Sequence, residues 1–437
     1  MAYRVGCISL GCEKNRVDAE MMMASLEREG FQLVDDVAMG DAAIVNTCGF
    51  IESAKQESIE EILELAKLKE EGRIKAIVVT GCLAERYQQE IAKELPEVNA
   101  VVGIGANKEI ARIVREALEG KRIETFPPKC ELPLEGERVQ STPSYFSYLK
   151  IAEGCDNHCT YCAIPLIRGG YRSRKMEDIL AEGVKELMVI AQDTTRYGED
   201  LYGEGKLPQL LTELCKVEGL RWIRVLYCYP ERITDELLEV MAIEDKILKY
   251  MDLPLQHCSR QVLRAMNRHG DRESLSALIR KIREKVPGIV LRTTFMVGFP
   301  GETEEAFEEL AEFAKEMRFE RMGCFAYSQE EGTPAARLPD QISREIKEHR
   351  QELMMEQQMA LMDEMSREMV GKTITVLNEG WDRYAECCFG RSAADAPEID
   401  TKVFFTVEGK KPYPGMFVQV EITDTMDCDL IGQVVTT

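Results

Sequence analysis

Histidine is scarce in this chain, and an excess of positive charge is missing. Only four of the 437 residues are histidine, so a histidine-rich metal centre is not expected. The 55 lysines and arginines are outnumbered by 77 aspartates and glutamates, which gives a formal net charge of −22. This balance argues against a large phosphate-binding surface and suits a basic protein partner. We therefore do not expect RNA binding to be the main role.

Long apolar runs are also missing. No stretch has the length needed to cross a bilayer, and the first residues lack the apolar core of a secretion signal. We therefore expect a cytoplasmic protein that does not need a membrane. The fifteen cysteines then indicate metal or cluster binding in a reducing compartment rather than a set of disulfides.

The most informative feature is a run of three cysteines, Cys155, Cys159 and Cys162, which we call the barrel triad. Cysteine normally ligates all four irons of a 4Fe–4S cluster, so three thiolates leave one iron open to a small molecule. A zinc site with His158 or a distant residue as fourth ligand is the alternative. Zinc sites usually pair C-x-x-C with a second ligand pair, and none follows nearby. We favour the cluster.

Three more cysteines, Cys12, Cys48 and Cys82, each stand beside a glycine at the end of a strand-like segment. We call them the sheet triad. The carboxyl ends of parallel strands meet at one edge of a sheet, where the helices that follow favour an anionic guest. Three unrelated buried cysteines are the alternative, but the repeated placement favours a second cluster. The remaining cysteines lack such spacing and are interpreted as structural: Cys7, Cys130, Cys215, Cys228, Cys258, Cys324, Cys387, Cys388 and Cys428.

Strand and helix patterns alternate along most of the chain, which predicts an α/β protein of three domains. Residues 1–125 read as an open parallel sheet with helices on both faces, and proline-rich residues 126–143 read as a linker. Residues 144–370 contain six candidate strands, which fit a partial (β/α)6 barrel with its chemistry at the carboxyl strand ends. Residues 371–437 change to short alternating strands, typical of a small all-β barrel.

Two helices have recognisable features. Ser53 is a plausible N-cap for a helix that extends to Glu71. A long helix rich in methionine and glutamate is expected over 342–369, packed across the barrel as a connector. Its methionines are interpreted as packing residues.

Taken together, the two triads and the three regions resemble the methylthiotransferase family of radical S-adenosylmethionine enzymes. The resemblance covers essentially the whole chain, and residues 371–437 resemble the TRAM domain. Several segments are similar to the branch of the family that acts on small-subunit ribosomal protein number twelve. They are Leu-Gly-Cys-Glu-Lys-Asn at 10–15, the segment from Asn46 to Ser58, Ala-Gln-Asp-Thr-Thr-Arg-Tyr-Gly at 191–198, Pro-Leu-Gln-His at 254–257 and the segment from Tyr327 to Ala336.

The resemblance implies a specific reaction. A 4Fe–4S cluster on the barrel triad would reduce S-adenosylmethionine to methionine and a 5′-deoxyadenosyl radical. The radical would take a hydrogen from the β-carbon of one aspartate of the ribosomal protein. A methylthio group assembled at a second 4Fe–4S cluster, on the sheet triad, would then be added there. A flavodoxin-like or ferredoxin-like donor would supply electrons.

The resemblance also implies contacts with S-adenosylmethionine. Two residues after the second barrel strand would meet its methionine part, and a glycine-containing loop after the fifth strand would approach its adenosine. By itself, Gly-Phe-Pro-Gly usually marks only a turn. The full set is Tyr161, Gln192, Asp193, Gly298, Gly301 and Glu302.

Three arginines, Arg168, Arg172 and Arg174, follow the barrel triad. They either neutralise carboxylates of the cofactor or substrate, or are ordinary solvated loop arginines.

Three features depart from the family pattern. Only twelve residues separate Arg174 from Leu187, which barely suffices for a crossover between parallel strands. The run from Asp400 to Lys402 replaces an expected Asp-Gly turn, and Cys428 replaces an expected tyrosine. We expect the changes at 400–402 and at Cys428 to affect turns or packing rather than chemistry.

Two other functions remain open at this point. A tRNA methylthiotransferase would use the same cofactors, but the C-terminal region has six basic and eleven acidic residues, a net charge of −5, which favours a basic protein over RNA. An iron–sulfur scaffold or electron carrier without catalysis would have a fully cysteine-ligated cluster that ignores S-adenosylmethionine.

Overall fold

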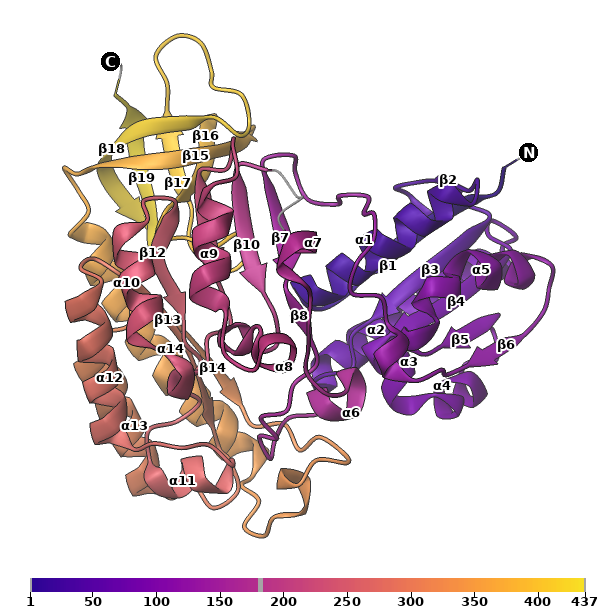
Figure 1. Ribbon diagram of the computed structural model, residues 1–437, viewed down its shortest axis with the longest axis horizontal. Helices are drawn as coiled ribbons and strands as arrows, with labels where there is room; N and C mark the ends of the chain where they lie inside the picture. Colours follow the sequence, from indigo (N-terminus) through magenta and orange to yellow (C-terminus); the bar gives the residue numbers. More distant parts are fainter. Residues whose placement is uncertain (1, 180–183, 436–437) are drawn as a thin grey trace.

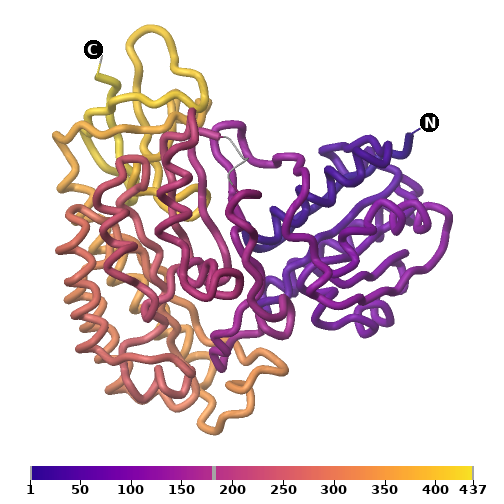
Figure 2. The backbone as a smooth tube through the Cα atoms, in the orientation of Figure 1, coloured from indigo at the N-terminus to yellow at the C-terminus, as the bar shows by residue number. Residues whose placement is uncertain are grey.

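The computed structural model describes residues 2–179 and 184–435. Figure 1 shows three units: an N-terminal sheet with its helices, a large central barrel, and a small barrel at the C-terminal end. The backbone trace in Figure 2 shows that the first unit lies beside the central barrel and that the last unit covers one of its ends. The predicted α/β architecture is confirmed.

The first unit is an open sheet in which all neighbouring strands are parallel, in the order β2-β1-β3-β4-β5-β6. Helices α1 and α5 pack on one face, and α2, α3 and α4 pack on the other. Because both faces are covered, β3 and β4 are buried along their whole length. The strands are β1 Arg4–Ser9, β2 Gln32–Leu33, β3 Ala42–Thr47, β4 Ala76–Gly81, β5 Ala100–Val102 and β6 Ile123–Thr125. The helices are α1 Glu13–Arg28, α2 Glu52–Glu70, α3 Cys82–Tyr87, α4 Gln89–Glu94 and α5 Ile110–Leu118.

Two local predictions in this unit are wrong. Helix α2 begins at Glu52, so its N-cap is Ile51 rather than Ser53, and no side chain caps it. The sequence after Thr80 predicts one helix that continues to Glu94, before Pro96. The chain instead turns at Gln88, whose φ of 43° separates α3 from α4. The chain therefore changes direction at Gln88, shortly after Cys82.

The central unit is a partial barrel of six parallel strands, in the order β14-β13-β12-β11-β10-β7. Along β13, buried positions alternate with half-buried ones, because one face packs on helices and the other lines the barrel. The strands are β7 Phe146–Lys150, β10 Glu186–Ile190, β11 Trp222–Val225, β12 Ile247–Asp252, β13 Val290–Val297 and β14 Arg321–Ala326. The helices are α7 Met176–Ile179, α8 Glu199–Tyr202, α9 Leu207–Cys215, α10 Asp235–Ile243, α11 Arg260–Ala265, α12 Arg272–Lys285 and α13 Glu304–Met317.

Part of the short first crossover lies outside the described residues, between α7 and β10. Short 3-10 helices connect other elements: η1 Val37–Met39, η2 Ile104–Glu109, η3 Lys129–Glu131, η4 Thr194–Arg196, η5 Pro230–Arg232 and η6 Ala335–Arg337.

The long methionine-rich helix is α14, Arg344–Arg367, and it packs on β13 and β14 before it leads to the last unit. That unit is a closed barrel in the order β15-β16-β17-β19-β18. Alternating patterns at 373–377, 403–407 and 416–422 predict three of its five strands, whereas β16 and β19 were not predicted. The strands are β15 Thr373–Asp382, β16 Cys387–Ser392, β17 Val403–Thr406, β18 Phe417–Met426 and β19 Asp429–Val434.

The C-terminal barrel covers the amino ends of the central strands. Arg391 lies 2.7 Å from Glu186 at the start of β10, and the ring of Phe417 meets Trp222 at the start of β11 edge-on, with 4.7 Å between centroids. The carboxyl ends of the strands lie at the opposite end of the barrel. Within the described residues, no helix has both the length and the apolar character needed to span a membrane.

The three sheets use residues 4–125, 146–326 and 373–434. The exact domain boundaries, 1–125, 144–370 and 371–437 with a linker at 126–143, remain a prediction.

Candidate active site

The barrel triad lies on a loop that is closed by a small antiparallel ribbon, β8 (Ala152–Glu153) and β9 (Arg172–Ser173). The two arms of the loop touch at its base. Gly154 has a φ of +80°, and a Cβ there would lie 2.1 Å from the carbonyl oxygen of Gly170. The next amide, of Cys155, donates to the carbonyl of Gly169 at 3.1 Å. Glycine is therefore required at the loop base.

Backbone amides point at two of the three sulfurs. The amide of Asn157 lies 3.5 Å from Cys155 Sγ, and the amide of Ile164 lies 3.4 Å from Cys162 Sγ. Such donors stabilise thiolates and help to set the reduction potential of a cluster, so the loop fits one. Burial raises the pKa of Cys155 to about 11 and of Cys162 to about 12. Iron must therefore displace a proton from each when it binds.

The sheet triad lies at the carboxyl edge of the first sheet. Cys12 follows β1, Cys48 follows β3, and Cys82 begins α3 after β4. A Cβ on Gly11 would lie 2.7 Å from Cys48 Sγ, so this glycine lets the first loop approach the second cysteine. Burial raises the pKa of Cys82 to about 12; nearby Cys12 and Cys48 add to the rise, and Arg168 opposes it. The structure thus brings the three predicted thiols together.

Neither triad resembles the site of a single metal ion. Throughout residues 2–179 and 184–435, no three histidine, cysteine, aspartate or glutamate side chains converge in that way. A cluster takes its thiolates at separate iron atoms, so more widely spaced sulfurs are compatible with it.

The sheet triad contacts the loop of the barrel triad across the boundary between the first and second units. Cys82 packs against Ala163 and Ile167 in a small buried cluster, and Ala163 directly follows Cys162. Helix α6, Ile164–Arg168, carries this contact onto α3. The loop of one triad therefore forms part of the wall of the other.

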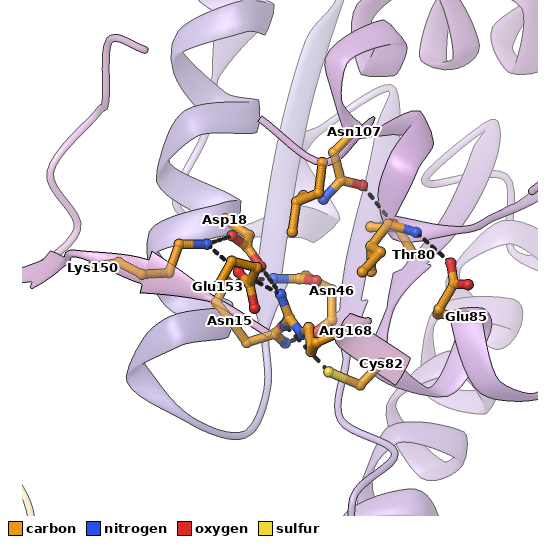
Figure 3. A network of polar contacts seen from close by, with 12 residues as sticks. Asn15, Asp18, Asn46, Thr80, Cys82, Glu85, Asn107, Lys150, Glu153 and Arg168 are labelled. Carbon is orange, nitrogen blue, oxygen red and sulfur yellow. Dashed lines mark hydrogen bonds and ion pairs between the residues drawn. The ribbon is translucent and has the colours of Figure 1, made fainter. Parts of the chain in front are cut away.

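The arginines after the barrel triad do not lie in open solvent. Arg168 and Arg174 are 2% and 6% exposed, so their interpretation as solvated loop arginines is wrong. Arg168 pairs with Asp18 and Glu153, both buried (Figure 3). Arg172, which is partly exposed, donates to backbone carbonyls of the linker.

Two of the residues expected to bind S-adenosylmethionine support the loop that carries the barrel triad. Gln192 donates to Glu153 at 2.6 Å, and its Oε1 is buried without a hydrogen-bond partner in the part of the chain that the structure describes. Asp193 accepts from Asn157 at 2.8 Å and from Arg232 at 3.0 Å. The carboxylate of Asp193 therefore fixes the loop, whereas Gln192 still offers an acceptor.

Buried hydrogen bonds hold the loop after β13 in its conformation. Glu302 is buried and accepts from the amide of Gly298 and from Arg350, both at 2.7 Å. Burial raises the pKa of Glu302 to about 7, against the effect of these donors. Gly298 and Gly301 have φ values of +71° and +81°, which glycine adopts without strain. Tyr161 packs on the apolar cluster that includes Phe299.

Sequence reasoning missed several residues that surround the triads. Arg268 lies with its guanidinium 4.3 Å from the ring centre of Tyr229, whose hydroxyl is 3.8 Å from Cys159 Sγ. Asn15 and Asp18 lie on the buried side of α1. The sequence could have pointed to them, because they are polar residues just after Cys12 at positions that face the interior. Arg268 had no such signal, since only folding brings it near Cys159.

Comparison with known proteins agrees with this architecture. Three family models match: uncharacterized protein family UPF0004 over residues 4–103, the radical SAM superfamily over residues 149–314, and the TRAM domain over residues 370–435. The matches follow the three units in order.

Whole-chain relatives decide the family. Proteins named ribosomal protein uS12 methylthiotransferase RimO are 49% identical in Desulforamulus reducens, over 98% of this chain and 99% of the relative, and 48% identical in Clostridioides difficile, over 99% of this chain and 98% of the relative. The chain belongs to the RimO family. As a RimO-family protein it is a radical S-adenosylmethionine enzyme, and that superfamily uses a 4Fe–4S cluster with S-adenosylmethionine.

A solved structure shares the fold at greater distance. The radical S-adenosylmethionine methyltransferase TsrM from Kitasatospora setae, with cobalamin and a [4Fe-4S] cluster bound, is 15% identical with a TM-score of 0.56, over 77% of each chain. At this identity the likeness concerns the fold alone.

Proposed function

We propose that this RimO-family chain adds a methylthio group to the β-carbon of an aspartate on small-subunit ribosomal protein uS12. The names of the relatives supply the substrate, and the acidic C-terminal unit suits a basic ribosomal protein. The observation that carries the proposal is the contact between the sheet triad and the loop of the barrel triad, where Cys82 packs on Ala163 and Ile167. An electron carrier has no need of two three-cysteine sites that share a boundary.

We infer two 4Fe–4S clusters, one on each triad, with S-adenosylmethionine at the open iron of the barrel triad. When bound, these groups supply a 5′-deoxyadenosyl radical and a methylthio group, chemistry that amino-acid side chains do not provide. A flavodoxin-like or ferredoxin-like donor would deliver the electrons, and the cytoplasm would be the compartment that holds both enzyme and ribosome.

The residues of the chain would bind and orient these groups. Asn157, Asp193 and Arg232 form a chain of hydrogen bonds that fixes the loop of the barrel triad. The unpartnered Oε1 of Gln192 would accept from the amino group of S-adenosylmethionine. The loop at Gly298 to Glu302 would bring backbone close to the adenosine, with Tyr161 as part of its apolar support.

The test compares ribosomal proteins from host cells with and without the gene. After digestion, the uS12 peptides are compared by mass spectrometry, and the gene is then returned as wild type or as Cys155→Ala. We expect the methylthio increment on one aspartate to disappear on deletion, to return with the wild type and to stay absent with the variant.

The nucleosides of tRNA from the same cells serve as the control. Loss of a methylthio nucleoside from tRNA, with uS12 unchanged, would support the tRNA alternative instead.

A further inference from the structure

Arg168 belongs to the central unit, but its side chain ends at the sheet triad. Its Nη2 lies 3.3 Å from Cys82 Sγ and 3.0 Å from Asn15 Oδ1. Its Nη1 donates to Asp18 and lies 3.4 Å from Glu153 Oε2. Figure 3 shows the guanidinium between these groups, with Cys82 on one side and the carboxylates on the other. It is the side chain of the barrel loop that is hydrogen-bonded to a sheet-triad sulfur.

The group around Arg168 is closed and balanced in charge. Lys150, 1% exposed, pairs with Asp18 and, at 2.7 Å, with Glu153. Two cations thus face two carboxylates with little access to water. Asn15 is held in turn, because its Nδ2 donates to the carbonyls that precede Cys12 and Cys48. A guanidinium stays charged at any physiological pH and offers donors in a fixed fork, so its place next to Cys82 is well determined.

We propose that Arg168 is a positioning residue that holds the Cys82 thiolate by an N–H···S hydrogen bond and thereby raises the reduction potential of the cluster on the sheet triad. The inference rests on the proposed second cluster. Reduction adds negative charge to a cluster, and a charged donor on one of its sulfurs stabilises that added charge. Because Arg168 follows the barrel triad directly, the potential of the sheet cluster depends on the docking of the central unit.

The neighbours of Arg168 make the direction of the effect testable. Arg168→Met removes one positive charge and the donor, and leaves two carboxylates facing one lysine. Asp18→Asn removes one negative charge from the same group and keeps Arg168 next to Cys82. The first change should lower the potential, and the second should raise it. Arg168→Lys keeps the charge but not the fork, so its potential should lie between those of the wild type and Arg168→Met.

The experiment uses the full-length chain in which Cys155, Cys159 and Cys162 are all replaced by alanine, so that one cluster is left. Iron is counted first after anaerobic reconstitution, with about four atoms per chain expected. The potential is then titrated with dithionite and followed by electron paramagnetic resonance. For Arg168→Met we expect about a tenfold shift toward the oxidised cluster at a fixed donor ratio, which is about 59 mV for one electron.

The outcomes separate the two proposals. A chain that holds no iron after these replacements would contradict the second cluster itself. A loaded cluster whose potential is the same in the wild type, Arg168→Met and Asp18→Asn would contradict only the role of Arg168, as would shifts in one direction for both. If Arg168→Met fails to load iron, the opposite shifts expected of Arg168→Lys and Asp18→Asn still decide the question.

Discussion

At the scale of single residues, glycine decides how closely the loops of the site can approach. Gly11 and Gly154 have positive φ values and face groups that leave no room for a side chain. At Gly11 the neighbour is Cys48 of the sheet triad. At Gly154 the neighbour is the opposite arm of the loop that carries the barrel triad. An alanine would therefore displace Cys48 at the first position and the backbone of Gly170 at the second.

Gly11→Ala should therefore lose the sheet cluster. The new Cβ would lie 2.7 Å from both Cβ and Sγ of Cys48. We expect the iron content of the reconstituted protein to fall from about eight to about four atoms per chain. Gly30→Ala is the matched control, because Gly30 has the same φ of +85° but nothing within 4 Å of an added Cβ. Equal iron in the two variants would contradict this reading of the loop.

At the scale of elements, buried charge joins the C-terminal barrel to the central one. Glu186, at the start of β10, lies 2.7 Å from Arg391 on β16 and 3.3 Å from Arg224 on β11. All three side chains are buried. Burial alone would raise the pKa of Glu186, but the two arginines outweigh it and lower the pKa below the ordinary value of 4.5. The carboxylate is therefore more acidic in the folded chain than in the unfolded one.

Glu186→Gln should destabilise the protein by about 3 kcal/mol near neutral pH. It removes the carboxylate that pairs with buried Arg224 and leaves buried Arg391 with Glu379 as its remaining charge partner. The stability that the ionised Glu186 contributes is fully present above pH 4.5 and is lost as the pH falls through its lowered pKa. As the pH falls through this range, the difference in urea midpoint between the wild type and the variant should become smaller. Glu308→Gln, at an exposed position, is the control. If the midpoint difference between the wild type and Glu186→Gln stays constant with pH, Glu186 does not make this contribution to stability.

At the scale of the whole molecule, the first two units are held together around the site. Glu330, in the loop after β14, is 3% exposed and lies 2.8 Å from Arg86 on α3 and 3.1 Å from Lys55 on α2. Those helices begin near Cys82 and Cys48. The edge of the central barrel thus fixes both helices of the sheet triad, in addition to the contact through Arg168.

Glu330→Gln should loosen this docking. With the buried charge removed, Arg86 and Lys55 lose their shared partner, and we expect limited proteolysis within 126–143 to become severalfold faster. The measurement is the rate of cleavage at low protease concentration. Glu331→Gln changes the exposed neighbour, whose backbone rather than side chain meets Arg86, and should leave the rate unchanged. Equal rates for both variants would argue that other contacts hold the units.

Much of the fold could be predicted because its signals are local. The strand β3 is a short apolar run, and the long helix α14 has no interruption between Arg344 and Arg367. The strands β16 and β19 were missed because each contains a glycine, and β19 also begins with an aspartate; both residue types disfavour strands locally. They form because closing the barrel pairs them with neighbours on both sides.

The sequence alone determined the features from which the two cluster sites are proposed: the spacing of the barrel triad, and the repetition of a cysteine beside a glycine after three strands. These features act within a few residues, where chain geometry leaves few alternatives. Only the tertiary structure decided that Arg168 leaves the barrel loop to meet Cys82, and that Asp193 and Glu302 support loops from within. Such partners are far apart in the chain, and a buried charge is matched by whichever opposite charge the packing brings to it.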